Sequence, residues 1–140
     1  MPKPRVIAAD PSVLVSLRPP FVDARGQLQH LVDAPFGSAL VMTSVKGAVR
    51  GRHYHKTDYH YTWLQSGELL YAHRPAGQSG PYQRWVIRPG QLFYTPPMYE
   101  HVMEFTADSV AVVLARNHRT MDHYEADTVR LAPAPGATPA

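Results

Sequence analysis

Short strand-length segments separated by Gly and Pro breaks run through this chain, and they limit it to an all-β fold. The segments are rich in Val, Tyr, Thr and Phe, which favour strands. Turn residues interrupt them, most clearly at Lys46-Gly47, Ser66-Gly67, 75–81, Pro89-Gly90 and Pro96-Pro97. The expected strands are residues 13–17, 27–32, 39–45, 49–55, 60–65, 68–74, 82–87, 92–95, 101–105 and 109–115. A longer helical pattern is missing, except over residues 119–126. This number of strands predicts a sandwich or barrel, most naturally a double-sheet jelly roll.

The pattern continues without a linker or an internal repeat, and it predicts a single domain over residues 5–131. With 140 residues, 44% of them hydrophobic and 18% charged, the chain can build a core and is not disordered throughout. Residues 132–140, which read APAPGATPA, are expected to form a disordered tail. No apolar run approaches the roughly 20 residues of a membrane helix, and the start does not resemble a secretory signal. We therefore expect a cytoplasmic protein without a membrane partner.

Charge and cysteine content narrow the chemistry further. The net charge is +3, from 14 Lys and Arg against 11 Asp and Glu, and the basic residues are scattered, so no nucleic-acid partner is expected. The absence of cysteine excludes disulfides, thiolate ligands and Cys nucleophiles. Eight histidines are then the only side chains whose ordinary pKa lies near neutrality.

Histidines gather in one stretch of the chain and suggest a metal site. His53 and His55 are two positions apart in an expected strand, so they project to the same face. His60 begins the next strand, and His101 follows the turn at Pro96-Pro97. Neutral imidazole is the commonest protein metal ligand, and these side chains can converge on one divalent transition metal, with Zn, Fe, Ni and Mn all open. Alternatively, they are surface or core histidines without a metal.

Hairpin geometry extends the predicted inner face. If Ser66-Gly67 is a two-residue turn, Thr62 lies opposite Tyr71 and His60 lies opposite His73. Alternation then places inside His60, Thr62, Leu64, Leu69, Tyr71 and His73, and outside Tyr61, Trp63 and Leu70. A bulge would reverse this assignment. Tyr71 is otherwise a core tyrosine, and His73 a rim or surface residue.

The spacing of these residues resembles the two motifs of the cupins. The first motif corresponds to Gly47, His53, His55, His60 and Gly67, and the second to Gly90, Pro96, Met98, His101 and Phe105. All spacings agree, while His60 replaces the usual Glu, Met98 a Gly and Phe105 an Asn. The resemblance covers about residues 20–131. It implies an all-β cupin fold, a double-stranded β-helix or jelly-roll barrel, with the metal ligands His53, His55, His60 and His101 inside.

A more particular resemblance is to cupins that act on nucleotide sugars. Residues 50–56, Arg-Gly-Arg-His-Tyr-His-Lys, are similar to segments of dTDP-4-dehydrorhamnose 3,5-epimerases and dTDP-4-keto-6-deoxyglucose 3,4-ketoisomerases. They also resemble a segment of the C-terminal cupin of capsular-polysaccharide reductases. The stretches Asp23-Ala24-Arg25-Gly26 and, more weakly, 124–130 are also similar to such proteins. The resemblance implies proton abstraction beside a sugar carbonyl, followed by reprotonation at another face or carbon.

The resemblance also suggests residue roles. In the ketoisomerases, the residues that match His53 and His55 move protons without a metal; in the epimerases, the match of His53 is the base and a Tyr is the acid. A metal-bound histidine is not free to act as a base. If these histidines bind a metal, another residue must therefore transfer the proton. The catalytic candidates are then Tyr71, Tyr94 and Glu104, with Tyr99 a further possibility. Candidate groups for binding the substrate and its diphosphate are Arg25, Arg50, Arg52, Lys56 and His73.

Together these patterns predict a metal-binding cupin, an epimerase- or isomerase-like protein for a nucleotide-linked keto sugar in polysaccharide or deoxysugar biosynthesis. Two other functions stay open at this point. One is a metal-dependent cupin dioxygenase, and the other is a non-catalytic binding module with a structural metal. Related cupins pair through edge strands, so a homodimer is expected.

Overall fold

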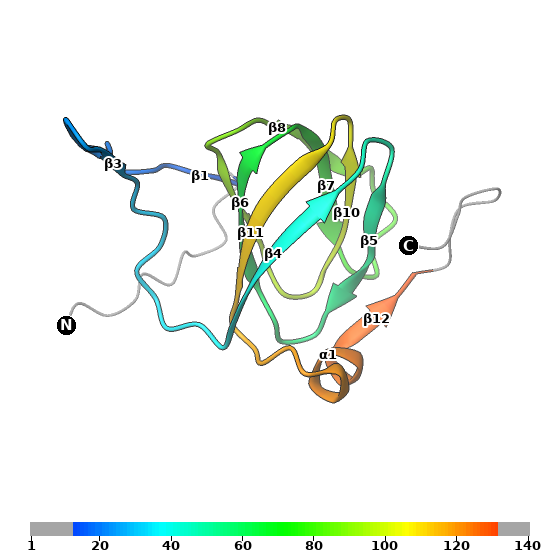
Figure 1. The fold of residues 1–140 in the computed structure, drawn as a ribbon. Coiled ribbons are helices and arrows are strands. Elements are labelled where there is room, and N and C mark those ends of the chain that lie inside the picture. Colours follow the sequence, from blue (N-terminus) through cyan, green and yellow to red (C-terminus); the bar gives the residue numbers. More distant parts are fainter. Residues whose placement is uncertain (1–12, 132–140) are drawn as a thin grey trace.

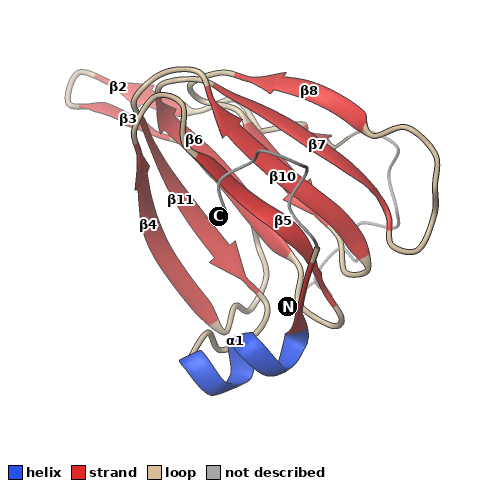
Figure 2. Ribbon diagram, turned by 90° about the vertical axis from the view of Figure 1, so that its right-hand side faces the viewer, coloured by secondary structure: helices blue, strands red, loops and turns tan. Residues whose placement is uncertain are grey.

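Two five-stranded sheets that face each other form the body of the molecule (Figure 1). The computed structural model describes residues 13–131. One sheet has the order β1-β9-β6-β11-β4 and the other β12-β5-β10-β7-β8. The strands are β1 Leu14–Val15, β2 Phe21–Asp23, β3 Gly26–Leu28, β4 Ser38–Ser44, β5 Val49–His55, β6 His60–Ser66, β7 Leu69–Pro75, β8 Gln83–Ile87, β9 Leu92–Thr95, β10 Tyr99–Phe105, β11 Ser109–Ala115 and β12 Thr128–Arg130. The helix α1 spans Met121–Asp127 and lies at one end of the two sheets (Figure 2).

The arrangement confirms the predicted all-β cupin architecture, with one difference. The two sheets do not close into a continuous barrel, because β4 is an edge strand and no ladder joins it to β5 or β12. All pairings within the two sheets are antiparallel. The space between the sheets is therefore open on the side of β4.

The expected hairpin between residues 60–65 and 68–74 is wrong. β6 pairs with β9 and β11, whereas β7 pairs with β8 and β10 in the other sheet. The connection at Gly67 crosses between the sheets with a φ of 94°, and a side chain there would collide with Ser109. The six residues expected inside, His60, Thr62, Leu64, Leu69, Tyr71 and His73, are all buried. Tyr61, which was expected outside, is also buried, because it packs against Phe36 and Tyr94. Alternation along a strand does not depend on which strand it pairs with.

The hydrophobic core fills one end of the space between the sheets. Its largest members, Leu64, Leu69, Tyr71, Phe93 and Phe105, come from β6, β7, β9 and β10 and are 0–1% exposed. Along β11 the inward positions are buried and the outward positions half-buried in strict alternation. The opposite end, between β4 and β5, is hollow and is lined by a mixture of apolar, histidine and arginine side chains.

Two terminal segments differ from the expected strands. The predicted strand 27–32 is only the second arm of a hairpin, β2–β3, whose turn Asp23-Ala24-Arg25-Gly26 is held by a hydrogen bond from the Arg25 amide to Asp23. After β11, the helical pattern at residues 119–126 does form α1, and β12 then adds to the edge of β5. Part of the predicted domain (5–12) and the predicted tail (132–140) lie outside the described residues. No helix within residues 13–131 is long and apolar enough to cross a membrane.

Candidate functional site

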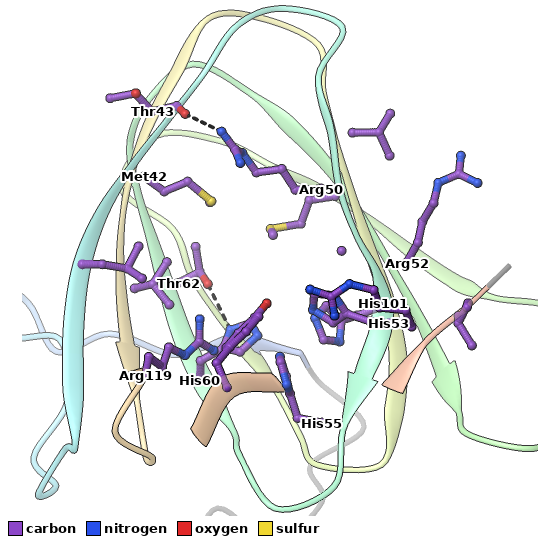
Figure 3. A pocket seen from close by; sticks show the side chains of 18 of the residues that line it. Met42, Thr43, Arg50, Arg52, His53, His55, His60, Thr62, His101 and Arg119 are labelled. Atoms are coloured by element: carbon purple, nitrogen blue, oxygen red, sulfur yellow. Dashed lines mark hydrogen bonds between the residues drawn. The ribbon is translucent and has the colours of Figure 1, made fainter. Parts of the chain in front are cut away.

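Three histidines from two neighbouring strands meet between the sheets (Figure 3). His53 and His55 belong to β5 and His101 to β10, and His101 is paired with His53 in the ladder. One ring nitrogen from each of the three lies within 4.8 Å of the others. The structure thus brings together three of the four predicted metal ligands, and we call His53, His55 and His101 the histidine triad.

A β-bulge in β5 sets the orientation of the triad. The register between β5 and β10 shifts after His101, so Arg52 is the extra residue. Gly51 has a φ of 93° and Arg52 a φ of 57°, and a Cβ at Gly51 would lie 2.7 Å from the carbonyl oxygen of His101. Bulges of this kind re-aim side chains beside functional sites. A glycine inside an expected strand, here Gly51, is the sequence feature that is typical of such a bulge.

Hydrogen bonds fix which nitrogen of two triad rings carries the proton. The Nδ1 of His101 lies 3.1 Å from the carbonyl oxygen of Tyr99, which can only accept, so this nitrogen donates. The Thr128 hydroxyl donates to the Tyr124 carbonyl (2.5 Å), so its oxygen accepts from the Nδ1 of His55 at 3.2 Å. In both neutral rings the lone pair is therefore on Nε2. Such partners on the remote nitrogen are typical of metal-binding histidines.

The electrostatics keep the triad uncharged at neutral pH. Burial, followed by neighbouring histidines and arginines, lowers the pKa of His53, His55 and His101 to about 3. These imidazoles do not need to lose a proton at pH 7 before they bind a cation, and neutral imidazole is the form that coordinates metals.

His60 lies beside the triad but is not part of it. Its ring centroid is 5.3 Å from that of His101 and 6.0 Å from that of His55. The ring is buried, and desolvation lowers its pKa well below the ordinary value. A role for His60 as a fourth ligand stays a prediction.

The triad borders a cavity of about 720 Å³ between the sheets. The lining combines residues of β4, β5, β6, β10 and β11 with residues between Arg119 and Leu131. It contains Arg50, Arg52, Arg119 and Arg130, and no Asp or Glu is among the described residues that line it. A cavity with this charge attracts anionic ligands. Of the expected substrate-binding residues, Arg50 points into the cavity, whereas the side chain of Arg52 points away from it (Figure 3).

Several other predicted site residues do not line this cavity. Tyr71 is fully buried in the core, where it accepts a hydrogen bond from Thr95 (2.9 Å) and donates to the Nδ1 of His73 (3.1 Å). His73 is itself only 5% exposed, and burial lowers its pKa to about 4. This buried pair corresponds to the core alternative for Tyr71, whereas the rim position considered for His73 is wrong.

Four more predicted residues point elsewhere. Tyr94 packs against Tyr61, with ring centroids 5.0 Å apart, because it alternates with the buried Phe93 and Thr95 and faces the outside of its sheet. Glu104 is exposed for the same reason, between the buried Met103 and Phe105. Arg25 lies in the β2–β3 hairpin, where it pairs with Asp23, and Lys56 lies in a separate cleft beside α1. The geometry gives these four side chains no contact with the cavity.

Two cavity residues were missed by the sequence analysis. The ring of Tyr124 lies 5.5 Å from that of His55 and 6.3 Å from that of His53. Arg119 precedes α1 and lies beside His60 (Figure 3). The only signals were the helical pattern at 119–126 and the weak similarity at 124–130. Neither indicates that this segment folds back onto the triad.

Comparisons with known proteins identify structures of similar fold. No protein-family model and no curated protein matches the sequence. The 3,4-ketoisomerase QdtA from Thermoanaerobacterium thermosaccharolyticum, as a point mutant in complex with TDP-4-keto-6-deoxyglucose, is 20% identical with a TM-score of 0.68; the match covers 84% of this chain and 85% of that one. The dTDP-4-dehydrorhamnose 3,5-epimerase from Sulfolobus tokodaii is 19% identical with a TM-score of 0.62, and the match covers 74% of this chain and 69% of that one. The capsular polysaccharide assembling protein CapF from Staphylococcus aureus is 22% identical with a TM-score of 0.61, and the match covers 84% of this chain and 32% of that one.

Proposed function

We propose that this chain, which has the RmlC-like cupin fold, is a metal-binding isomerase or epimerase that acts on a nucleotide-linked keto sugar. The observation that carries the proposal is the histidine triad at the wall of a cavity lined by arginines and by no carboxylate among the described residues. The structural neighbours include sugar-nucleotide ketoisomerases and an epimerase, and one of them was solved with TDP-4-keto-6-deoxyglucose.

The chemistry of the triad suits a divalent transition metal. His53, His55 and His101 are neutral, their nitrogens are within 4.8 Å of one another, and two of the rings are oriented by hydrogen bonds on Nδ1. Three protein ligands with a remaining open position are typical of catalytic rather than structural metal sites. Bound there, the ion would supply Lewis-acid polarisation of the substrate carbonyl.

The arginines of the cavity suit the diphosphate of such a substrate. Arg50 is held at the wall by hydrogen bonds to the Ser44 hydroxyl (2.9 Å) and the Thr43 carbonyl (3.0 Å). Arg52 borders the cavity, but its side chain points away from the histidine triad and from Arg50 (Figure 3). Guanidinium groups bind phosphate oxygens through paired hydrogen bonds. We therefore assign Arg50 to the diphosphate.

Proton transfer needs groups at the cavity that an ion would leave free. If the triad alone holds the ion, two such groups are left at the cavity: the imidazole of His60 and the phenol of Tyr124. We assign the removal and return of the substrate proton to these two, in place of Tyr94 and Glu104, which face away. Without a metal, His53 and His55 would take the acid–base roles that the ketoisomerase resemblance implies.

Solvent exchange tests the proposed function directly. TDP-4-keto-6-deoxyglucose is incubated with the zinc- or nickel-loaded protein in deuterium oxide and followed by proton NMR. We expect deuterium at a carbon next to the carbonyl, strong loss of exchange in Tyr124→Phe, and unchanged exchange in the matched control Tyr94→Phe. An absence of exchange with this compound and with a panel of other nucleotide-linked keto sugars would contradict the proposal.

We also propose a homodimer, with the β2–β3 hairpin as its contact. The hairpin projects from the two sheets and exposes Phe21, Val22 and Leu28 by 61%, 66% and 72% (Figure 1). Phe21 and Leu28 lie opposite each other in the hairpin, and exposed apolar side chains that lie together are typical of an interaction site. Light scattering is expected to give twice the 15.6 kDa chain mass, and the Phe21→Ser/Leu28→Ser variant should be monomeric. A monomeric wild-type protein at micromolar concentration would contradict the dimer.

A further inference from the structure

Arg119 is held rigidly at the inner wall of the cavity. Its Nε donates to Asp58 at 3.2 Å, and the side chains of this pair are only 16% and 3% exposed. The second oxygen of Asp58 accepts from the Asn117 amide at 3.0 Å. On the other side, the guanidinium carbon lies 5.4 Å from the centre of the Tyr124 ring. A guanidinium clamped in this way loses little freedom when it binds a ligand.

One donor group of Arg119 has no hydrogen-bond partner among the described residues. The Nη2 nitrogen is buried and unpaired, although the residue lines the cavity beside His60 (Figure 3). Two other cavity arginines differ: Arg50 donates to Thr43 and Ser44, and Arg130 pairs with Glu125 at 2.8 Å. A buried donor without an acceptor destabilises the folded protein. An oxygen atom that enters the cavity would relieve this cost.

The position of Arg119 indicates what kind of oxygen it would bind. Arg119 lines the same cavity as His53, His55, His60 and His101, and it lies beside His60 (Figure 3). Asp58 is turned to the Nε side of the guanidinium and does not line the cavity, so it leaves the opposite side for a ligand. Because no Asp or Glu among the described lining residues competes for Nη2, the complementary group is an anionic oxygen of the ligand.

We propose that Arg119 is a specificity-determining residue that binds an anionic oxygen of the ligand next to the histidine triad. This proposal deepens the proposed function and rests on it for the role of the triad. The proposal narrows the substrate class to compounds that have a second oxygen near the reacting carbonyl. This second oxygen is either already ionised or becomes negatively charged when the substrate proton is removed. Asp58 is a positioning residue, since it acts through Arg119.

Oxalate is a suitable probe, because its two carboxylates imitate two adjacent anionic oxygens. Its affinity is measured by calorimetry for the apoprotein and the zinc-loaded protein. Arg119→Gln is expected to weaken oxalate binding about 10-fold or more in both forms, as expected for the loss of a hydrogen bond to a charged group. Arg119→Lys keeps the positive charge but loses the paired N–H donors of the guanidinium. Its oxalate affinity should therefore lie between those of the wild type and Arg119→Gln. The control Arg84→Gln, at an exposed arginine that does not line the cavity, should bind within about threefold of the wild type.

A second variant separates an effect of the substitution on folding from its effect on oxalate binding. Arg119→Gln leaves Asp58 buried without its partner, so the Asp58→Asn/Arg119→Gln variant removes both charges and should regain thermal stability without regaining oxalate affinity. Unchanged oxalate affinity in Arg119→Gln, in both forms, would overturn the proposal. Metal content is measured separately: a protein that binds no ion contradicts the triad, while the effect of Arg119 is still decided in the apoprotein.

Discussion

Buried neutral histidines predict a steep loss of stability in mild acid. His55, His60, His73 and His101 are each 5% exposed or less. In the folded protein the pKa of His55 and His101 is about 3 and that of His73 about 4, while that of His60 lies well below its ordinary value. In the unfolded chain all of them return to about 6.5. Between these limits the unfolded state binds more protons than the folded state, so stability falls as the pH falls below 6.5.

The size of the effect follows from the same values. At pH 5.5 each unfolded histidine gains about 1.4 kcal/mol from protonation that the folded state cannot match. Four such groups together lower the free energy of unfolding by roughly 5 kcal/mol between pH 7.5 and pH 5.5. Because small domains are stable by only about 5–15 kcal/mol, the apoprotein should be close to unfolding at pH 5.

Urea unfolding of the chelator-treated apoprotein, followed by fluorescence of its two tryptophans, measures this dependence. We expect the free energy of unfolding to drop steadily from pH 7 to pH 5.5. The His73→Gln variant should lose about 1.3 kcal/mol less over this range, an average of about 0.8 kcal/mol per pH unit for one titrating group. A free energy of unfolding that changes by less than about 1 kcal/mol over this range would refute the burial of neutral imidazoles.

Two further substitutions test the surroundings of the triad. Gly51→Ala should destabilise the protein by more than the roughly 1–3 kcal/mol of backbone strain alone, since its Cβ would meet the His101 carbonyl at 2.7 Å. The control Gly77→Ala has a φ of 77° and open space around it, so only the strain should remain in thermal denaturation. Thr128→Val removes the hydroxyl that bonds to His55 and should weaken zinc affinity about 10- to 100-fold with little change in melting temperature; equal affinity would contradict the oriented tautomer.

Local patterns predicted most of the strands and their inner faces, but not how the strands pair. Alternation placed Thr62 and Tyr71 inside correctly, whereas the turn at Gly67 was interpreted as a hairpin although it crosses between sheets. A short turn alone does not specify whether two strands pair or separate, because that depends on distant strands such as β10 and β11.

Local patterns likewise predict only those parts of the candidate site that do not depend on long-range contacts. The triad follows from motif spacing, since His53, His55 and His101 lie on neighbouring strands. Arg119 and Tyr124 reach it only because the segment after β11 folds back and β12 joins β5, a long-range contact without a local signal. Tyr94 and Glu104 were selected by chemical type, and strand alternation places them on the outer faces.

The histidine triad, formed by His53 and His55 of β5 and the distant His101 of β10, is proposed to hold one cation. The direct measurement is the metal content of protein purified without chelator, compared with that of His101→Ala. The account predicts close to one divalent transition-metal ion per chain in the wild type and loss of that ion in the variant. A metal-free wild type after growth with abundant transition metals, or a variant that retains its ion, would contradict it.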